Sequence, residues 1–266
     1  MTPAAYTDLE LAHAMADAAR SAILPHFRQP GLSSENKLKD GFDPVTVADR
    51  AAEMVMRDLL RAHRPQDGVW GEEYGHVSGT SGRTWVLDPI DGTRGFLSGT
   101  PTWGVLIALA DAQGPSLGII DQPYIGERFV GTPETAFVRG PLGERPLGTR
   151  PTTRLDQAIL FTTFPEVGTP EDRIGFEAVA RQVKLTRYGT DCYAYGLLAA
   201  GHIDLVIEAG LHAYDIMAPI AVIQAAGGVV TDWQGAPVHE GGRVVAAATA
   251  ELHARALDVV QAAISA

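Results

Sequence analysis

The apolar positions along this chain follow two spacings, one typical of helices and the other typical of strands. Near the N-terminus they recur at intervals of three and four residues, which predicts a helix from Thr7 or Asp8 to about Phe27. The same spacing over Thr46–Ala62 predicts a second helix. Between the two, positions 29–43 are polar and rich in turn residues, so a loop or a short hairpin is predicted there.

Short runs of bulky residues alternate with further helical patterns in the rest of the chain. The runs predict strands at 69–71, 83–87, 103–110, 117–120, 128–130, 158–162, 185–188, 203–207, 229–232 and 244–248. Further helices are predicted at 172–183, 192–200, 215–226 and 252–264. This alternation indicates a layered α/β fold. Because the segment 140–151 is rich in Gly, Pro and Arg, we expect one domain with halves at about 1–145 and 146–266.

The composition and the charge narrow the classes of partner. Apolar residues make up 45% of the chain and charged residues 20%, which is ordinary for a globular protein and argues against disorder. The formal net charge is −11, and no run of Lys and Arg occurs. Nucleic acid and anionic membranes are therefore not expected as partners.

The cysteine count and the N-terminus indicate a cytoplasmic protein. Cys192 is the single cysteine, so no disulfide can form within one chain, which suits a reducing compartment. The first helical segment has neither a basic start nor a continuous apolar stretch, and is therefore not expected to be a signal peptide. No apolar stretch approaches the length of a transmembrane helix.

The clearest candidate for chemistry is the run Asp-Pro-Ile-Asp-Gly-Thr at 88–93, directly after the predicted strand 83–87. Asp88 and Asp91 can converge if the chain turns between them, and two adjacent carboxylates need a cation. Mg²⁺ is suited to carboxylate oxygens, and the backbone carbonyl of Ile90 is a natural further ligand. Gly92 allows the backbone to approach an anion closely. The alternative is a turn with two solvated aspartates.

Two further acidic positions are candidates for the same ion. Glu72 and Glu73 follow the predicted strand 69–71, and because adjacent side chains point differently, we expect only Glu72 to be a direct ligand, with Glu73 behind it. The alternative is a charged loop tip. Asp215 lies at the start of the predicted helix 215–226, where it could join the cluster or simply cap the helix as its N-cap residue.

Asp49 has a local and a functional interpretation. If Thr46 is the N-cap residue of the second helix, Asp49 falls at the third helical position, as in a capping box with Asp in place of Glu. The functional interpretation is that Asp49 and Thr93 form a pair that orients and deprotonates a water held by the metal.

Taken together, the segments V-T-x-A-D at 45–49, G-E-E at 71–73, W-x-x-D-P-I-D-G-T at 85–93, and Y-D at 214–215 resemble the inositol-monophosphatase-like family of metal-dependent phosphatases. A helix that ends in A-G-G at 226–228 completes the pattern, and all segments occur in the family's order. The resemblance implies a five-layered αβαβα sandwich, usually a homodimer, that binds two or three Mg²⁺ ions and a small phosphate ester.

On the matched positions, the resemblance also implies roles for individual residues. The metal ligands would be Glu72, Asp88, Asp91, Asp215 and the Ile90 carbonyl, and the amides of Gly92 and Thr93 would hold phosphate. Asp49 and Thr93 would be the catalytic pair that activates water for direct attack on phosphorus. The required cations also explain how so acidic a protein binds an anionic substrate.

Within the family, the segments 91–99, 101–109, 188–196 and 203–210 are most similar to the histidinol-phosphate phosphatase branch. Histidinol phosphate carries an amine and an imidazole, so its pocket should present carboxylates, for which Asp191 and Glu208 are the candidates. Their alternatives are a helix N-cap for Asp191 and a solvated charge at a strand end for Glu208. Arg94 is expected to contact either phosphate or an acidic side chain.

Other activities and one non-enzymatic function stay open at this point. Inositol 1-phosphate, fructose 1,6-bisphosphate and adenosine 3′,5′-bisphosphate are alternative substrates within the same family. A metal-binding regulator without activity is the alternative from another class. It would be expected to have lost Asp49, Thr93 or a ligand, and all of them are present.

Overall fold

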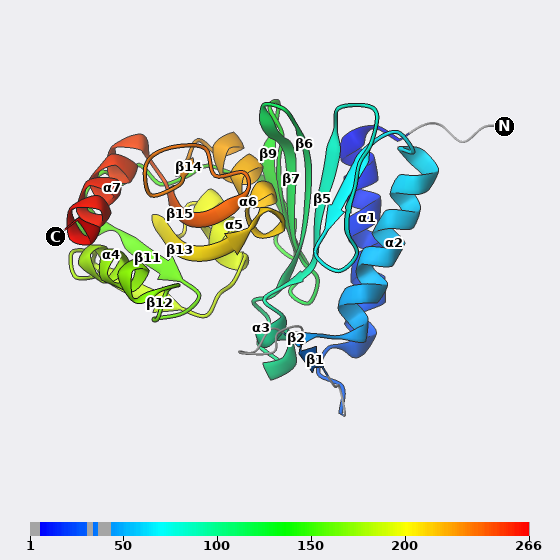
Figure 1. Cartoon of the computed structure of the whole chain (residues 1–266), viewed down its shortest axis with the longest axis horizontal. Helices are drawn as coiled ribbons and strands as arrows, with labels where there is room; N and C mark the ends of the chain where they lie inside the picture. The colour runs from blue at the N-terminus through cyan, green and yellow to red at the C-terminus, as the bar shows by residue number, and fades with distance from the viewer. Residues whose placement is uncertain (1–5, 31–33, 37–43, 266) are drawn as a thin grey trace.

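The computed structural model describes residues 6–30, 34–36 and 44–265. Five layers follow one another across the molecule in Figure 1. An outer pair of helices, α1 (Asp8–Ile23) and α2 (Val47–His63), covers an eight-stranded sheet. The central helices α5 (Tyr193–Ala199) and α6 (Ala213–Ala225) separate it from a five-stranded sheet, whose far face is covered by α4 (Pro170–Ala180) and α7 (Ala250–Ile264). The predicted αβαβα fold is confirmed.

The eight-stranded sheet is built from one continuous stretch of the first half. Its strands are β3 (Gly68–Gly71), β4 (Gly75–Val77), β5 (Thr84–Asp91), β6 (Gly104–Asp111), β7 (Gly114–Gln122), β8 (Glu127–Gly131), β9 (Ala136–Gly140) and β10 (Gly143–Pro146). Their order is β10-β9-β8-β7-β6-β5-β3-β4, with β3 and β5 parallel and the other pairs antiparallel. A short helix, α3 (Thr93–Ser98), leaves the end of β5.

The five-stranded sheet belongs to the second half. Its strands are β11 (Ile159–Thr162), β12 (Leu185–Tyr188), β13 (Leu205–His212), β14 (Val229–Thr231) and β15 (Gly241–Ala247), in the order β12-β11-β13-β15-β14. β11 runs parallel to β12 and β13, because helical crossovers join them. The remaining elements are short: 3₁₀ turns at Leu24–His26 and Leu155–Gln157, and the antiparallel pair β1 (Glu35–Asn36) and β2 (Pro44–Val45).

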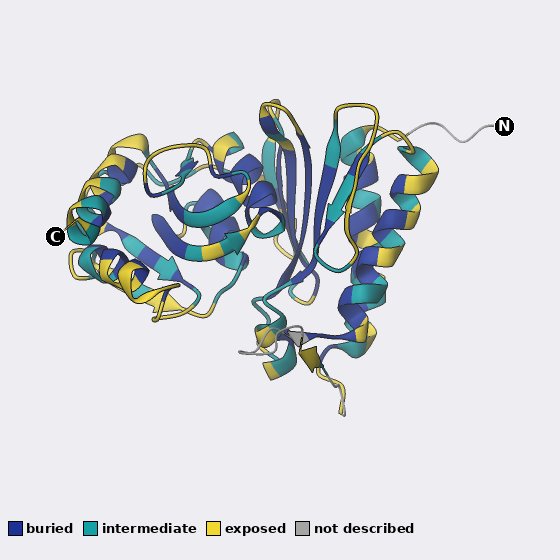
Figure 2. Ribbon diagram, viewed as in Figure 1, coloured by how far each residue is buried: buried dark blue, intermediate teal, exposed yellow. Residues whose placement is uncertain are grey.

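Three apolar cores separate the layers, and Figure 2 shows the buried residues concentrated on the inner faces of the elements. One core lies beneath α1 and α2 and includes the fully buried Trp85 and Trp103. The central core surrounds α6, which is apolar on almost every side because sheets cover both of its flanks. The third core lies beneath α4 and α7 around Trp233.

The helical predictions agree with the structure to within a few residues at each end. Strands β4, β9 and β10 were not predicted. The residues of β4 and β10 are exposed, and β9 has only the short apolar run Phe137-Val138. The segment 140–151, predicted as a boundary, contains β10, which pairs with β9. Of the predicted loop 29–43, positions 31–33 and 37–43 lie outside the described residues.

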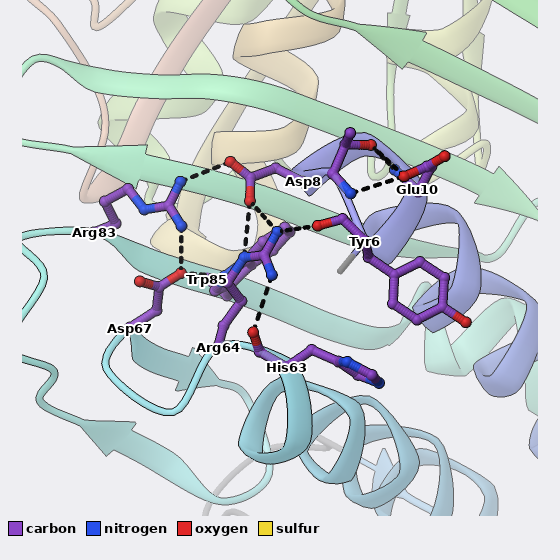
Figure 3. A network of polar contacts seen from close by, with 9 residues as sticks. Tyr6, Asp8, Glu10, His63, Arg64, Asp67, Arg83 and Trp85 are labelled. Atoms are coloured by element: carbon purple, nitrogen blue, oxygen red, sulfur yellow. Dashed lines mark hydrogen bonds and ion pairs between the residues drawn. The ribbon is translucent and has the colours of Figure 1, made fainter. Parts of the chain in front are cut away.

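A network of ion pairs connects the start of α1 to the end of α2 and to the start of β5 (Figure 3). Asp8, at the start of α1, accepts hydrogen bonds from Arg64 at 2.8 Å and from Arg83 at 2.6 Å. Arg83 also reaches Asp67, which accepts a further bond from the indole of the buried Trp85. Because Arg64 follows α2 and Arg83 precedes β5, this network fixes both outer helices against the sheet. In the described part of the chain, no helix has the length and apolar character needed to cross a membrane.

Candidate active site

A cavity of about 430 Å³ lies where the two halves meet. Its wall is formed by the end of β5, the start of α3, the segment after β11, and the starts of α5 and α6. Its volume falls within the range of small-molecule sites, about 300–1,000 Å³. The acidic residues of the lining come from both halves: Glu72, Asp88, Asp91, Asp191, Glu208 and Asp215.

A β-bulge brings the two aspartates of the 88–93 run to one side of the sheet. In a regular strand, residues three apart point to opposite faces. Here Asp88 pairs with Leu106 and Asp91 pairs with Gly104, so β5 carries one residue more than its partner between these two positions. The extra residue restores both carboxylates to the same face. The expectation that the strand ends before them is therefore wrong, since β5 continues to Asp91.

Asp215 completes a cluster with these two residues. One carboxylate oxygen from each of Asp88, Asp91 and Asp215 lies within 4.8 Å of the others. The alternative of an N-cap Asp215 is wrong, because α6 begins at Ala213 and its N-cap residue is His212. Asp215 stands at the third helical position, where its carboxylate accepts a 2.7 Å hydrogen bond from the backbone N–H of His212. This bond fixes the orientation of the Asp215 side chain at the N-terminal end of α6.

The electrostatics of the cluster disfavour negative charge. Burial, followed by the charges of Glu72 and its two partners in the cluster, raises the pKa of Asp88 well above its usual value. Burial and the charge of Asp215 raise the pKa of Asp91 in the same way. Burial raises the pKa of Asp215 to about 7, although the His212 amide opposes the shift. A hard cation would remove this penalty, and the all-oxygen donor set fits a divalent metal ion.

Glu72 reaches the same cavity from the turn between β3 and β4. Its backbone N–H donates to the carbonyl of Leu87 in β5 at 3.2 Å, and its charge raises the pKa values of Asp88 and Asp215. The backbone N–H of the adjacent Glu73 instead donates to Glu53 on α2. The structure therefore brings Glu72 beside the cluster, and Glu72 is half-buried there rather than an exposed loop tip.

The capping box predicted for Asp49 is present, and the other oxygen of the same carboxylate faces Thr93. Oδ2 accepts from the backbone N–H and the hydroxyl of Thr46 at 2.8 and 2.5 Å, which completes the predicted capping box of α2. Oδ1 lies 3.4 Å from the Thr93 hydroxyl, which also donates to the carbonyl of Ile90 at 3.0 Å. Asp49 is 1% exposed, so this pairing is shielded by protein.

Asp191 is not the N-cap of α5, contrary to the alternative considered above. The N-cap residue is Cys192, and Asp191 has a left-handed backbone with φ of 45°. Its carboxylate accepts a 3.2 Å hydrogen bond from the Thr102 hydroxyl and packs against Gly92, where an added Cβ would lie 2.7 Å from the carboxyl carbon. Burial raises the pKa of Asp191, and the Thr102 hydroxyl and the charge of Arg94 oppose that shift.

Glu208 is buried, so the alternative of a solvated charge is wrong. Its carboxylate accepts hydrogen bonds from the N–H and hydroxyl of Thr163 and from the hydroxyl of Tyr195 at 2.7 Å. Burial nevertheless raises its pKa. Arg94 also lines the cavity, and its guanidinium stacks over the ring of Phe164 at 4.9 Å. This contact joins α3 of the first half to the segment after β11 of the second half, at the wall of the cavity.

Sequence reasoning missed three residues that support the site: Glu53, Thr163 and Tyr195. Thr163 and Tyr195 carried no signal, because their partner Glu208 is distant in the chain. Glu53 did carry one. It lies four residues after Asp49, on the buried face of an amphipathic helix, where an acidic residue needs a partner.

The layers and the acidic cavity together define an α/β protein with a cluster of carboxylates that could hold a metal ion, in a cavity lined by both halves. The chain belongs to the inositol monophosphatase family, whose model matches residues 6–265. It is therefore a phosphatase of that family, a phosphoric monoester hydrolase.

Individual relatives differ in the substrate that their names give. The chain is 38% identical to the bifunctional phosphatase IMPL2 of Arabidopsis thaliana, over 98% of this chain and 78% of that protein. It is 34% identical to a histidinol-phosphatase of Streptomyces coelicolor, over 92% and 94%. Among solved structures, an inositol monophosphatase from Zymomonas mobilis has a TM-score of 0.85 and 42% identity, over 96% of this chain and 97% of that one.

Proposed function

We propose that this protein is a Mg²⁺-dependent phosphatase that hydrolyses histidinol phosphate to histidinol and phosphate, a step of histidine biosynthesis. The observation that carries the proposal is the presence, in one cavity, of the three-aspartate cluster and two further carboxylates, Asp191 and Glu208. An ester with an amine and an imidazole needs such carboxylates beyond the metal site. The similarity to the Streptomyces histidinol-phosphatase supports this substrate.

In the proposed site, the side chains of Glu72, Asp88, Asp91 and Asp215 and the carbonyl of Ile90 bind the cations. When bound, Mg²⁺ lowers the pKa of water, neutralises the phosphate and stabilises the leaving oxygen. The two or three ions, the homodimer and the cytoplasmic location stay predictions.

The proposed catalytic pair is Asp49 and Thr93. The Thr93 hydroxyl would accept a hydrogen bond from the attacking water, and Asp49 would take up the proton through the 3.4 Å contact between their oxygens. Thr93 is also the first residue of α3, so its N–H has no acceptor within the helix and is suited, with that of Gly92, to hold phosphate. Phosphorus would be attacked directly, with no phosphoenzyme.

A specific observation favours an alternative substrate, inositol 1-phosphate. The Zymomonas inositol monophosphatase is the more similar of the two bacterial proteins described above, and carboxylates can accept hydrogen bonds from hydroxyl groups as well as from amines. Fructose 1,6-bisphosphate and adenosine 3′,5′-bisphosphate have no comparable support here. The retention of Asp49 and Thr93 argues against a regulator without activity.

A comparison of substrates tests the proposal. Phosphate release from L-histidinol phosphate, inositol 1-phosphate and the two bisphosphates should be measured with Mg²⁺ present. We expect kcat/KM for histidinol phosphate to exceed the others by at least about tenfold, equivalent to about 1.4 kcal/mol of selective binding in the transition state. A preference for inositol 1-phosphate would replace the proposed substrate while leaving the phosphatase intact.

Asp191→Asn tests the substrate end of the cavity with little strain, because Asn tolerates the left-handed backbone that Asp191 adopts. We expect kcat/KM for histidinol phosphate to fall about 10- to 100-fold, since a hydrogen bond to a charged group contributes about 1.5–3 kcal/mol. Activity on phenyl phosphate, which has no cationic group, should change less than about threefold. Glu166→Gln is the matched control, because it removes one negative charge from an exposed position of the segment after β11. Equal losses on both substrates would make Asp191 a structural residue.

A further inference from the structure

Glu53 holds the turn that carries Glu72, although its own side chain lies outside the cavity. It stands on the inner face of α2 and is completely buried. Its Oε2 accepts a 2.6 Å hydrogen bond from the N–H of Glu73, and its Oε1 accepts a 3.1 Å bond from the N–H of Tyr74. The two amides that directly follow Glu72 are thus bound to one carboxylate.

Arg57 completes this attachment. Its Nε lies 2.7 Å from Oε1 of Glu53, one helical turn away, and its second nitrogen donates to the carbonyl of Gly75. The guanidinium therefore neutralises the buried carboxylate and binds the far end of the same turn. An unpaired charge at this depth would be strongly destabilising, so the two side chains form one unit.

Gly71 shows how closely the turn approaches Glu53. A Cβ at this position would lie 2.0 Å from Oε1, so only glycine allows the backbone to rest against the carboxylate. On the other side of the turn, the N–H of Glu72 donates to Leu87 in β5. The backbone around Glu72 is thereby fixed between α2 and β5, the two elements that also carry Asp49 and Asp88.

We propose that Glu53, paired with Arg57, is a positioning residue that sets the place of Glu72 relative to Asp49 and the aspartate cluster. The inference rests on the proposed metal site. Asp49 and Glu53 lie one turn apart on α2, so a single rigid helix fixes the water-activating acid directly and the Glu72 ligand through the turn. Residues that orient a metal ligand through hydrogen bonds, without contacting the metal, typically contribute about 10- to 100-fold to metal affinity or activity.

Glu53→Gln tests the proposal, because it keeps the shape of the side chain while replacing one accepting oxygen with an NH₂ group that cannot accept. Binding of Mg²⁺ alone should be measured by calorimetry, together with the Mg²⁺ dependence of turnover. We expect the affinity for Mg²⁺ to fall about 10- to 100-fold in both measurements, with kcat at saturating Mg²⁺ within about threefold of the wild-type value. Wild-type affinity in the variant would overturn the proposal.

Asp121→Asn is the matched control. Asp121 is equally buried and is bound by two arginines, Arg20 and Arg128, at 2.8 and 2.7 Å, but it does not line the cavity. Its replacement should lower thermal stability without changing the affinity for Mg²⁺. If both variants weaken Mg²⁺ binding equally, Glu53 acts only through general stability and the proposal is wrong.

Variants of Arg57, the partner of Glu53, test the same unit and do not depend on the folding of Glu53→Gln. Arg57→Lys alone should weaken Mg²⁺ binding several-fold. If the pair acts through Glu72, the double variant Arg57→Lys/Glu72→Gln should bind Mg²⁺ less than about twofold more weakly than Glu72→Gln alone. Additive losses would contradict the proposal. Absence of Mg²⁺ binding by the wild-type protein would instead overturn the metal site itself, and with it this inference.

Discussion

Asp91→Asn is expected to reduce kcat by at least about 10³-fold while the protein stays folded. The substitution removes one charge from the aspartate cluster, where a bound cation is worth several kcal/mol of transition-state stabilisation. Asn keeps an oxygen that can accept the 2.6 Å hydrogen bond from the N–H of Cys192. Turnover should be measured at saturating Mg²⁺, with thermal unfolding of the metal-free protein as the check on folding.

The metal-free variant should be at least as stable as the wild-type protein, because one of three mutually repelling carboxylates has been neutralised. Asp258→Asn, on the exposed face of α7, is the control for charge removal and should leave kcat unchanged. Near-normal activity of Asp91→Asn would remove this residue from the proposed metal site. Loss of folding would show that its bond to Cys192 matters more than its charge.

The metal-free protein is expected to lose stability as the pH rises from about 4 to about 7. Burial raises the pKa of Asp215 from 3.8 to about 7 and raises the pKa values of Asp88 and Asp91 as well. The folded state therefore binds more protons than the unfolded state within this window. The contribution of these bound protons to the free energy of unfolding is complete near pH 4 and is lost as the pH rises through the folded-state pKa. The loss is on the order of a few kcal/mol, since one pKa unit corresponds to about 1.4 kcal/mol.

Denaturant unfolding at several pH values, with and without Mg²⁺, measures this effect. Mg²⁺ should add little stability near pH 4 and progressively more towards pH 8, because protons and the cation compete for the same carboxylates. Comparison with Asp215→Asn, in which one of these groups no longer titrates, separates the cluster from the other acidic residues. A difference between the Mg²⁺ and metal-free curves that does not depend on pH would contradict the prediction.

Local features of the chain were well predicted because their causes lie within a few residues. The capping box between Thr46 and Asp49 needs only neighbours along the chain, and it forms as predicted. The helices follow from apolar spacing in the same way.

The interpretations that were wrong concern residues whose partners are distant. The carboxylate of Asp191 packs against Gly92, which is 99 residues earlier in the chain, and a search for helix caps cannot reveal such a contact. Glu208 is buried because Thr163 and Tyr195 supply its hydrogen bonds from other elements. β9 pairs with β8 on one side and with the edge strand β10 on the other, and β10, whose four residues are all exposed, depends on that pairing rather than on an apolar pattern of its own.

The sequence by itself determined the family, the layered fold and the acidic residues that can hold a cation, because each of these depends on residue type, order and short-range spacing. Only the tertiary structure decided how those residues meet. The bulge in β5 turns Asp88 and Asp91 to one face, α6 brings Asp215 from the other half, and Glu53 fixes the turn of Glu72. The physical reason is that a carboxylate acquires its pKa and its direction from burial and from donors that the chain supplies only once its layers have packed.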